Sequence, residues 1–329
     1  MTAAAAVARL LSVRGIRHVW CFPGGTISPL LDAIDREGIR VLVARNEAGA
    51  GHAAQGAYRV SGGVQIVLTT SGPGVTNAVT PIADAYYDSD AVVFLTGQVG
   101  TGMMRGNRPV RQRGFQETPT EEIVRPITKA VFVSMSPGTL ARNVDRALRI
   151  SLLGRPGPVV VDCPMDVQRG EAGEAYPLAE GGGQTISWRP HAEIGWRALL
   201  NAKCPLIIAG RGALDAHALV RTLVQTTGWA LVASMPAVGV IPTDWKQYRG
   251  IVGHTGHRAA NEAVRDADCL LVLGARLDVR QTGTLVDDWA RDKTVIRVDV
   301  DPQELSYSRV RLDIPCRTTV KEWLRWIAK

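Results

Sequence analysis

The chain has 329 residues, 46% of them hydrophobic and 21% charged, with 38 Lys and Arg against 31 Asp and Glu. This length favours two domains with buried cores. No apolar run reaches the ~18 residues that a membrane span needs, and the densest basic cluster, residues 105–113, has no interleaved aromatic residue. We therefore expect neither a membrane protein nor a nucleic-acid binder. Five widely spaced cysteines without a CxxC argue against disulfides and a zinc ribbon and favour a reducing, cytoplasmic compartment.

The first half alternates short apolar runs with helical stretches. Residues 1–15, MTAAAAVARLLSVRG, contain no acid, but a strand pattern follows at once, so we interpret them as a first helix and not as a removable leader. Strands are expected at 18–22, 64–70, 91–97 and 158–163, and helices at 27–36, 46–60 and 75–87, with starts near Asn46 and near Thr76 or Asn77. The alternation predicts a parallel sheet with crossover helices.

The second half repeats this pattern after a change of composition. Residues 169–190 contain three consecutive glycines and several acids with little periodicity, as an interdomain linker does. Further strands are expected at 205–210, 230–235, 269–274 and 295–300, with a helix ending near 227 and a last helix at 319–328. The predicted fold class is α/β, with two doubly wound, mostly parallel domains: residues 1–168 and a Rossmann-like domain at 191–329.

Four segments of the first half fall where loops leave the strand ends, which is where ligands bind in open α/β sheets. They are Phe22–Gly25, Asn46–Ala50, Ser71–Asn77 and Gly97–Val99. Each has a structural explanation of its own. The glycines can turn the chain or allow tight packing, and Glu47 can complement a helix N-terminus.

Together and in this order, these segments resemble those of the thiamine-diphosphate-dependent enzymes of the acetolactate synthase type. In the first half the similar stretches are FPGG (22–25), NEAGAGHAAQGAYR (46–59), TTSGPGVTN (69–77), ADAYYDSD (83–90), LTGQV (95–99), GFQETPTEEIVRPITK (114–129) and GRPGPVVVDCPMDV (154–167). The second half is similar to the family's central domain, most clearly at LLVLGARLDVRQTG (270–283) and RVDVDPQE (297–304). The resemblance covers essentially the whole chain.

The resemblance implies a thiamine diphosphate site with named contributors. Glu47 matches the carboxyl group that bonds N1′ of the cofactor's aminopyrimidine and so promotes loss of the thiazolium C2 proton, and we expect it in an apolar pocket. Phe115 and Gln116 match the pair that faces the substrate, with Gln116 hydrogen-bonding a substrate oxygen, and Gly25 leaves room for an acceptor. The remaining cofactor-side positions are Pro23, Gly24, Ser71, Gly72, Pro73, Asn77 and Gln98.

The central domain of acetolactate synthases binds FAD, which takes no redox part in the carbon-bonding reaction. The positions that match this flavin site are Arg155, Gly253, Gly256, Asn261, Arg276, Asp278 and Asp299. Val279 and Gln281 depart from the pattern, and related enzymes keep this domain with no flavin or with another nucleotide, so both alternatives stay open. A metal site on His254 and His257 is not expected, because this HxxH lacks a nearby third ligand.

Three departures from the family stand out. Asn46 replaces the His that commonly precedes the glutamate. Residues 100–114, GTGMMRGNRPVRQRG, form a longer connection with four arginines; this is either a solvated surface loop or a lid or docking loop for an anionic substrate or acidic partner. The third domain, which holds the diphosphate through Mg²⁺ with a Gly-Asp-Gly segment, is missing, although the chain reads like a complete gene product. We expect a separate subunit to supply this domain and Mg²⁺, in a hetero-oligomer built on a dimer.

The leading hypothesis is a subunit of a split carboligase, which decarboxylates a small 2-oxo acid such as pyruvate and joins the product to a second carbonyl compound. Two alternatives stay open: a simple 2-oxo acid decarboxylase subunit, and a non-catalytic regulatory or nucleotide-binding subunit. The catalytic hypotheses are favoured because the chain retains Glu47, Ser71–Asn77 and Gln116. A non-catalytic subunit would not need an acidic residue that faces a cofactor pocket.

Overall fold

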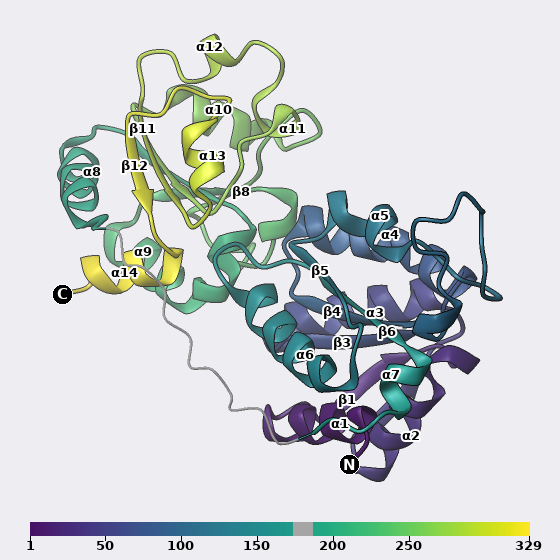
Figure 1. Ribbon diagram of the computed structural model, residues 1–329. Helices are drawn as coiled ribbons and strands as arrows, with labels where there is room; N and C mark the ends of the chain where they lie inside the picture. The colour runs from purple at the N-terminus through teal and green to yellow at the C-terminus, as the bar shows by residue number, and fades with distance from the viewer. Residues whose placement is uncertain (174–186) are drawn as a thin grey trace. The chain divides into compact units, whose positions relative to one another are not determined.

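The computed structural model describes residues 1–173 and 187–329, which form two compact units on either side of the segment between them (Figure 1). Most of the expected linker, 169–190, therefore lies outside the described residues. At its two ends the chain is helical, with α7 (Met165–Arg169) before it and α8 (Arg189–Asn201) beginning at Arg189. In the described part of the chain, every helix is too short or too polar to cross a bilayer.

The first unit contains a six-stranded sheet in which all strands run parallel, in the order β2-β1-β3-β4-β6-β5. The strands are β1 (His18–Cys21), β2 (Arg40–Val43), β3 (Gln65–Thr69), β4 (Val92–Gln98), β5 (Ala130–Val133) and β6 (Val159–Pro164). The interior strands β3, β4 and β6 are buried at every position, as parallel strands covered on both faces must be. The strands expected in this half are confirmed as β1, β3, β4 and β6.

Helices cover both faces of this sheet. One core contains residues of α1 (Ala3–Val13), α2 (Ser28–Arg36), α6 (Pro137–Leu152) and α7; the other contains residues of α3 (Glu47–Ser61), α4 (Pro73–Asp88) and α5 (Thr120–Val124). The expected first helix and the helix start at Asn46 are confirmed. The start expected near Thr76 or Asn77 is wrong: α4 begins at Pro73, because the fixed φ of proline suits the first helical turn.

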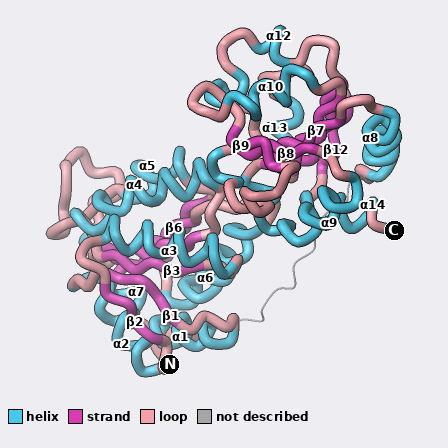
Figure 2. Tube along the Cα trace, turned by 180° about the vertical axis from the view of Figure 1, so that it is seen from behind, coloured by secondary structure: helices cyan, strands magenta, loops and turns pink. Residues whose placement is uncertain are grey.

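The second unit repeats the architecture with a second sheet of strands, drawn in magenta in Figure 2. Its strands run parallel in the order β12-β11-β10-β7-β8-β9. Its strands are β7 (Pro205–Ala209), β8 (Ala230–Ala233), β9 (Tyr248–Ile251), β10 (Cys269–Leu273), β11 (Thr294–Asp299) and β12 (Ile314–Arg317). After α8, its helices are α9 (His217–Thr227), α10 (Arg258–Asp266), α11 (Val279–Thr282), α12 (Val286–Trp289), α13 (Pro302–Ser306) and α14 (Val320–Ile327). The predicted α/β class with two doubly wound domains is confirmed. The strand order reverses between β7 and β10, which makes that pair the topological switch point.

Candidate active site

Three loops at the carboxyl edge of the first sheet are joined around the side chain of Thr26. Its hydroxyl lies 2.9 Å from the hydroxyl of Thr70 and accepts a hydrogen bond from the Ser71 N–H at 2.9 Å. A Cβ on Gly24 would lie 2.4 Å from the Cβ of Thr70, and one on Gly97 would lie 2.3 Å from the Thr26 hydroxyl. Only glycine permits this approach, so the loops after β1 and β3 meet the end of β4 at one edge of the sheet.

Glu47 is the first residue of α3 and is only 4% exposed. Its Oε2 accepts a hydrogen bond from the Asn77 side-chain amide on α4 at 3.0 Å. Its Oε1 has no hydrogen-bond donor among the described residues, and it lies 3.3 Å from where a Cβ on Gly74 would be. One carboxyl oxygen is therefore fixed by the protein, and the other is available to a ligand.

Two neighbours define the surroundings of this carboxyl group. Asn46 caps α3, since its side-chain oxygen accepts the Gly49 N–H at 2.6 Å. Burial raises the pKa of the Cys21 thiol at the end of β1 to about 12, and the nearby charge of Glu47 adds to the increase. The thiol is thus protonated at neutral pH and gives Glu47 a weakly polar neighbour. The sequence did not single out Cys21, and no pattern around it would have done so.

Gln116 packs directly against the loop that precedes α4. A Cβ on Gly72 would lie 2.8 Å from the Cβ of Gln116, and the Gly72 N–H donates to the Thr118 hydroxyl at 2.8 Å. Both Gly72 and Gln116 have positive φ, 63° and 62°, which is unusual for a non-glycine residue and common at functional sites. Gln116 is half-buried, whereas the adjacent Phe115 is 85% exposed. The structure therefore places Gln116 beside the glycine loop and leaves Phe115 open to solvent.

Gln98 faces the protein interior, although the resemblance assigned it to the cofactor side. Its amide nitrogen donates to the Thr118 carbonyl at 2.7 Å and to Asp162 at 3.0 Å, and its oxygen accepts the Val99 N–H at 3.0 Å. The side chain is 1% exposed. Its amide is thus used to support the segment that carries Gln116. Pro73 and Asn77, by contrast, are exposed at the start of α4.

Asp162 is a buried acid that the sequence analysis did not assign. It stands near the end of β6 and is 2% exposed, and it accepts hydrogen bonds from Thr96 at 2.7 Å and from Gln98. Burial raises the pKa of Asp162 to about 6, although bonds from Thr96, Gln98 and Thr120 act in the opposite direction. The available signal was a charged residue within the apolar run PVVVDC. Asp162 positions the segment beneath Gln116 and is remote from solvent.

In the second unit, the loops at the switch point approach each other closely. A Cβ on Gly210, after β7, would lie 2.1 Å from the carbonyl oxygen of Gly274, after β10, and Gly274 has a φ of 56°. Gly274 lies within the similar stretch at 270–283, but neither glycine was predicted as a site residue. Doubly wound folds bind nucleotides outside the carboxyl ends of the strands at such a switch point.

The positions that match a flavin site in the second unit shape nearby loops. Asn261 exchanges two hydrogen bonds of 2.9 Å with the backbone of Gly253, which has a φ of 121°. A Cβ on Gly256 would lie 2.2 Å from the Ile251 carbonyl oxygen. Asp278 pairs with Arg276 at 3.1 Å and caps α11. These contacts hold the backbone in place, and the side-chain amide of Asn261 is committed to Gly253.

The two remaining positions that match a flavin site, Asp299 and Arg155, also form hydrogen bonds within the protein. Asp299 accepts the Asp301 N–H at 3.0 Å and pairs with the fully buried Arg297 at 3.5 Å. Arg155 belongs to the first unit, where its guanidinium donates to the Ser89 hydroxyl at 2.8 Å and to the Tyr87 carbonyl at 3.4 Å.

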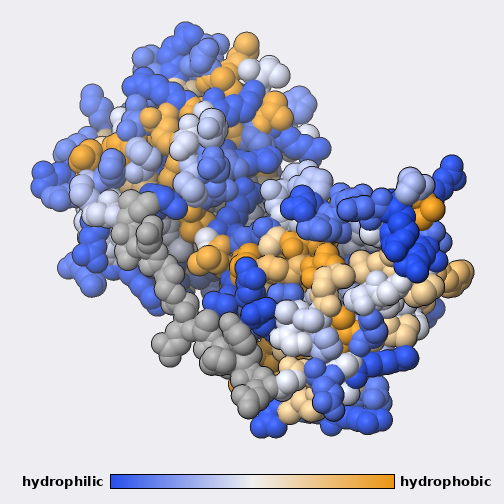
Figure 3. All heavy atoms as spheres, in the orientation of Figure 1, coloured by the Kyte–Doolittle hydropathy of each residue, from blue (hydrophilic) through white to orange (hydrophobic). Residues whose placement is uncertain are grey.

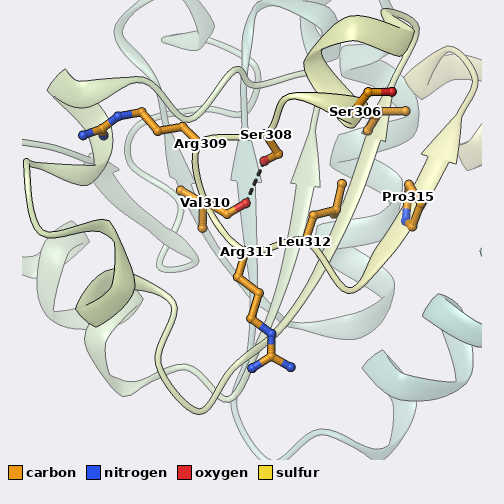
Figure 4. A pocket seen from close by; sticks show the side chains of 8 residues that line it. Ser306, Ser308, Arg309, Val310, Arg311, Leu312 and Pro315 are labelled. Carbon is orange, nitrogen blue, oxygen red and sulfur yellow. Dashed lines mark hydrogen bonds between the residues drawn. The ribbon is translucent and has the colours of Figure 1, made fainter.

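Two other features of the second unit are a pocket and the HxxH segment. A pocket of about 360 Å³ lies beside the loop that leads into β12, and its lining includes Ser308, Arg309 and Arg311 (Figure 4). The Ser308 hydroxyl donates to the Val310 carbonyl, and both arginines bond to protein oxygens. His257 of the HxxH accepts the Ile251 N–H on Nδ1. Within residues 1–173 and 187–329, no three His, Cys, Asp or Glu side chains gather as metal ligands.

Comparison with known proteins shows which protein families the two units resemble. Residues 1–123 match the family described as thiamine pyrophosphate enzyme, N-terminal TPP binding domain, and residues 196–327 match thiamine pyrophosphate enzyme, central domain. The chain is 36% identical to the acetolactate synthase large subunit of Corynebacterium glutamicum, over 98% of this chain and 52% of that protein. It is 37% identical to acetolactate synthase large subunit IlvB1 of Mycobacterium tuberculosis (98% and 52%) and 34% identical to the isozyme 2 large subunit of Escherichia coli (94% and 56%). The chain thus spans about half the length of these relatives.

Proposed function

The chain belongs to the thiamine pyrophosphate enzymes, and from that membership we propose that its first unit supplies the pyrimidine side of a thiamine diphosphate site. The observation that carries the proposal is the geometry of Glu47, which is buried, fixed through Oε2 by Asn77 and open at Oε1. Gly74 lies beside Oε1 of Glu47 and, like Gly72, presents no side chain to a ligand, and a Cβ on Gly25 would meet nothing within 4 Å.

Thiamine diphosphate, when bound, supplies an acidic thiazolium C–H and an electron sink for decarboxylation. Glu47 would hold the aminopyrimidine side of the cofactor, with Oε1 as the carboxyl oxygen available to share a proton with the ring nitrogen N1′. Asn77 keeps the carboxyl group oriented toward the ring by holding Oε2. Burial beside Cys21 limits the access of water to the Glu47 carboxyl group, which would favour proton exchange with the ring over exchange with solvent. Gln116, held against Gly72, offers its side-chain amide to an oxygen of the substrate.

The proposed reaction is decarboxylation of a small 2-oxo acid followed by carboligation. The bond between the carboxyl group and the carbonyl carbon breaks, CO₂ leaves, and that carbon forms a bond to a second carbonyl carbon, whose oxygen takes up a proton. Similarity to three proteins named acetolactate synthase supports coupling over simple decarboxylation, in which a proton replaces the second carbonyl compound.

Product analysis tests this reaction class. The enzyme, completed by the polypeptide proposed below, is incubated with labelled pyruvate, with and without a second carbonyl compound. We expect a coupled product that retains the label. Exclusive formation of the aldehyde would favour the decarboxylase, and no thiamine-diphosphate-dependent turnover in either arm would favour the non-catalytic subunit.

We further propose that a separate polypeptide holds the diphosphate and Mg²⁺, in a cytoplasmic hetero-oligomer built on a dimer. The 329 residues contain no Gly-Asp-Gly segment, and Mg²⁺ needs several oxygen ligands in near-octahedral geometry. Co-purification of this chain with a polypeptide that contains Gly-Asp-Gly, followed by Mg²⁺-dependent cofactor binding, is the expected result. Cofactor turnover by this chain alone would contradict the proposal.

For the second unit we propose a nucleotide at the switch point between β7 and β10, with FAD as the form that the resemblance implies. Support comes from the position, because doubly wound folds bind ligands at the carboxyl ends of the strands beside the switch point. Gly210 and Gly274 present backbone and no side chains at that position. Denaturing the purified protein and recording the visible absorbance of the supernatant tests the flavin. A stoichiometric flavin spectrum is expected, and a colourless supernatant would favour the flavin-free alternative.

A further inference from the structure

The connection between β4 and α5 carries a projecting loop, residues 105–113, which we call the arginine arm. Every residue from Gly106 to Arg113 is exposed. Figures 1 and 2 both show this connection extending beyond the helices of the first unit, and Figure 3 shows hydrophilic side chains at that place. The arm therefore presents its side chains to solvent.

The carboxylate of Glu117 closes the neck of the arm. Its Oε1 accepts the Arg105 N–H at 2.5 Å, and its Oε2 accepts the N–H groups of Arg113 at 2.8 Å and Gly114 at 3.4 Å. Partial burial opposes ionisation, but these backbone donors hold the pKa of Glu117 below its ordinary value. The Gln112 side chain donates to the Glu117 carbonyl at 3.0 Å. The two ends of the arm are thus joined through one ionised side chain.

Most of the positive charge on the arm is not neutralised by the residues that the structure describes. Arg105 pairs with Glu122 at 3.3 Å. Arg108 donates to the Arg105 carbonyl oxygen at 3.1 Å. Within the described residues, the guanidinium groups of Arg108, Arg111 and Arg113 form no ion pair with a carboxylate. Cations held on a preorganised frame favour association with an anionic surface, because less ordering entropy is lost on binding.

The neighbouring side chains indicate a protein partner and not a small anion. Phe115 at the base of the arm is 85% exposed, Met103 is 51% exposed and Val110 is 45% exposed. Exposed aromatic residues and methionine together with arginine are typical of protein interfaces. A small anion on an arm that projects into solvent would remain largely hydrated, whereas an acidic surface can contact three arginines at once.

We propose that the arginine arm, together with Phe115, is a docking surface for an acidic segment of another polypeptide. The surface adjoins Gln116, so the bound polypeptide lies beside the substrate-facing residue. If the proposed function holds, this polypeptide is the one that carries the diphosphate. Binding of an acidic segment to the arginine arm requires neither the cofactor nor catalytic turnover. A binding test of the arm can therefore fail or succeed independently of the catalytic proposal.

A binding titration tests the docking surface. The probe is a fluorescently labelled glutamate-rich peptide, followed by anisotropy at low and at physiological salt, with duplex DNA and inorganic phosphate as competitors. The triple variant Arg108→Gln, Arg111→Gln, Arg113→Gln is expected to weaken peptide binding by about tenfold. The matched control removes three exposed arginines elsewhere on the first unit, Arg9→Gln, Arg17→Gln and Arg40→Gln, and is expected to change binding by no more than about twofold.

A second variant separates the shape of the arm from its charge. Glu117→Gln makes the protein more positive, so charge alone would strengthen peptide binding. Because the variant loses part of the bridge across the neck, we expect binding to weaken instead. Glu121→Gln changes the charge equally at a residue that pairs with Arg125 and lies outside the neck, and it is expected to leave binding unchanged or slightly stronger. Thermal melting checks that each variant is folded.

Three outcomes would overturn the inference. Equal weakening by the two triple variants would mean that the peptide senses net charge only. Tighter binding of DNA than of the peptide would assign the arm to nucleic acid, and displacement of the peptide by phosphate at low millimolar concentration would assign it to a small anion.

Discussion

Asn77 on α4 donates a hydrogen bond to the Glu47 carboxylate on α3 over 3.0 Å, and this contact joins the two helices at the edge of the sheet where both begin. The helices approach closely, since a Cβ on Gly51 would lie 2.5 Å from the Cβ of Pro81. The orientation of the carboxyl group therefore depends on how α3 packs against α4, as well as on the residues that flank Glu47.

Replacing Asn77 with Ala tests this contact. The variant frees Oε2 of Glu47, so thiamine-diphosphate-dependent turnover of the completed enzyme is expected to fall by about tenfold, as loss of one hydrogen bond to a charged group implies. The free energy of unfolding is expected to change by less than about 1 kcal/mol, because Asn77 is exposed. Steady-state kinetics and urea denaturation measure the two quantities. Thr76→Ala, next to it and also exposed, serves as the control; equal losses in both variants would remove the special role of Asn77.

Adjacent glycines provide a matched test of the close approach between loops. In Gly24→Ala the new Cβ would lie 2.4 Å from the Cβ of Thr70, whereas in Gly25→Ala it would meet nothing within 4 Å. Both glycines have an ordinary negative or extended φ, so the two variants differ only in the room available for the new Cβ. We expect Gly24→Ala to lower the free energy of unfolding by about 1–3 kcal/mol and Gly25→Ala to change it by less than about 0.5 kcal/mol. Urea denaturation measures both, and similar values would mean that the loops adjust freely.

The raised pKa of Asp162 predicts how the free energy of unfolding depends on pH. Its pKa in the folded protein is about 6, above the ordinary value of 3.8, because burial disfavours the charged form. Between these two values the folded state binds more protons than the unfolded state, so this residue makes the protein more stable as the pH falls from about 6 toward about 4. The shift corresponds to roughly 2–3 kcal/mol over the whole window.

The measurement for Asp162 is the difference in free energy of unfolding between wild type and Asp162→Asn at several pH values from about 4 to 7. The Asn side chain does not titrate, so the difference is expected to change steadily across this window and to level off above about pH 6.5. A constant difference would show that Asp162 does not exchange a proton on unfolding in this range.

The expected strands were all interior strands, and each sheet contains two edge strands that the sequence did not reveal. These are β2 and β5 in the first sheet and β9 and β12 in the second. Interior parallel strands are covered by helices on both faces and read as continuous apolar runs. The edge strands lack this signature: Arg40–Val43 has no buried residue, Tyr248–Ile251 contains Gly250 at a φ of 105°, and Ile314–Arg317 contains Pro315.

The sequence indicates a candidate site where the chemistry depends on residue type within a motif. Glu47 and the glycine loop both lie at the start of a helix that follows a strand of the first sheet, and their roles toward a cofactor stay predictions. Contacts between segments distant in the chain had no sequence signal. Gln98 bonds to Asp162 across 64 positions, and Glu117 spans the neck of a loop that precedes it. Such partners follow from packing and not from spacing.

The most direct test of the account measures proton exchange at the thiazolium C2 of thiamine diphosphate in the completed enzyme, by quenched-flow in D₂O with NMR detection. Glu47→Gln keeps the size of the side chain but cannot share an acidic proton with the ring, so exchange is expected to slow by about a hundredfold or more with assembly and melting temperature unchanged. Exchange at the wild-type rate in this variant would contradict the role assigned to Glu47 and the function built on it.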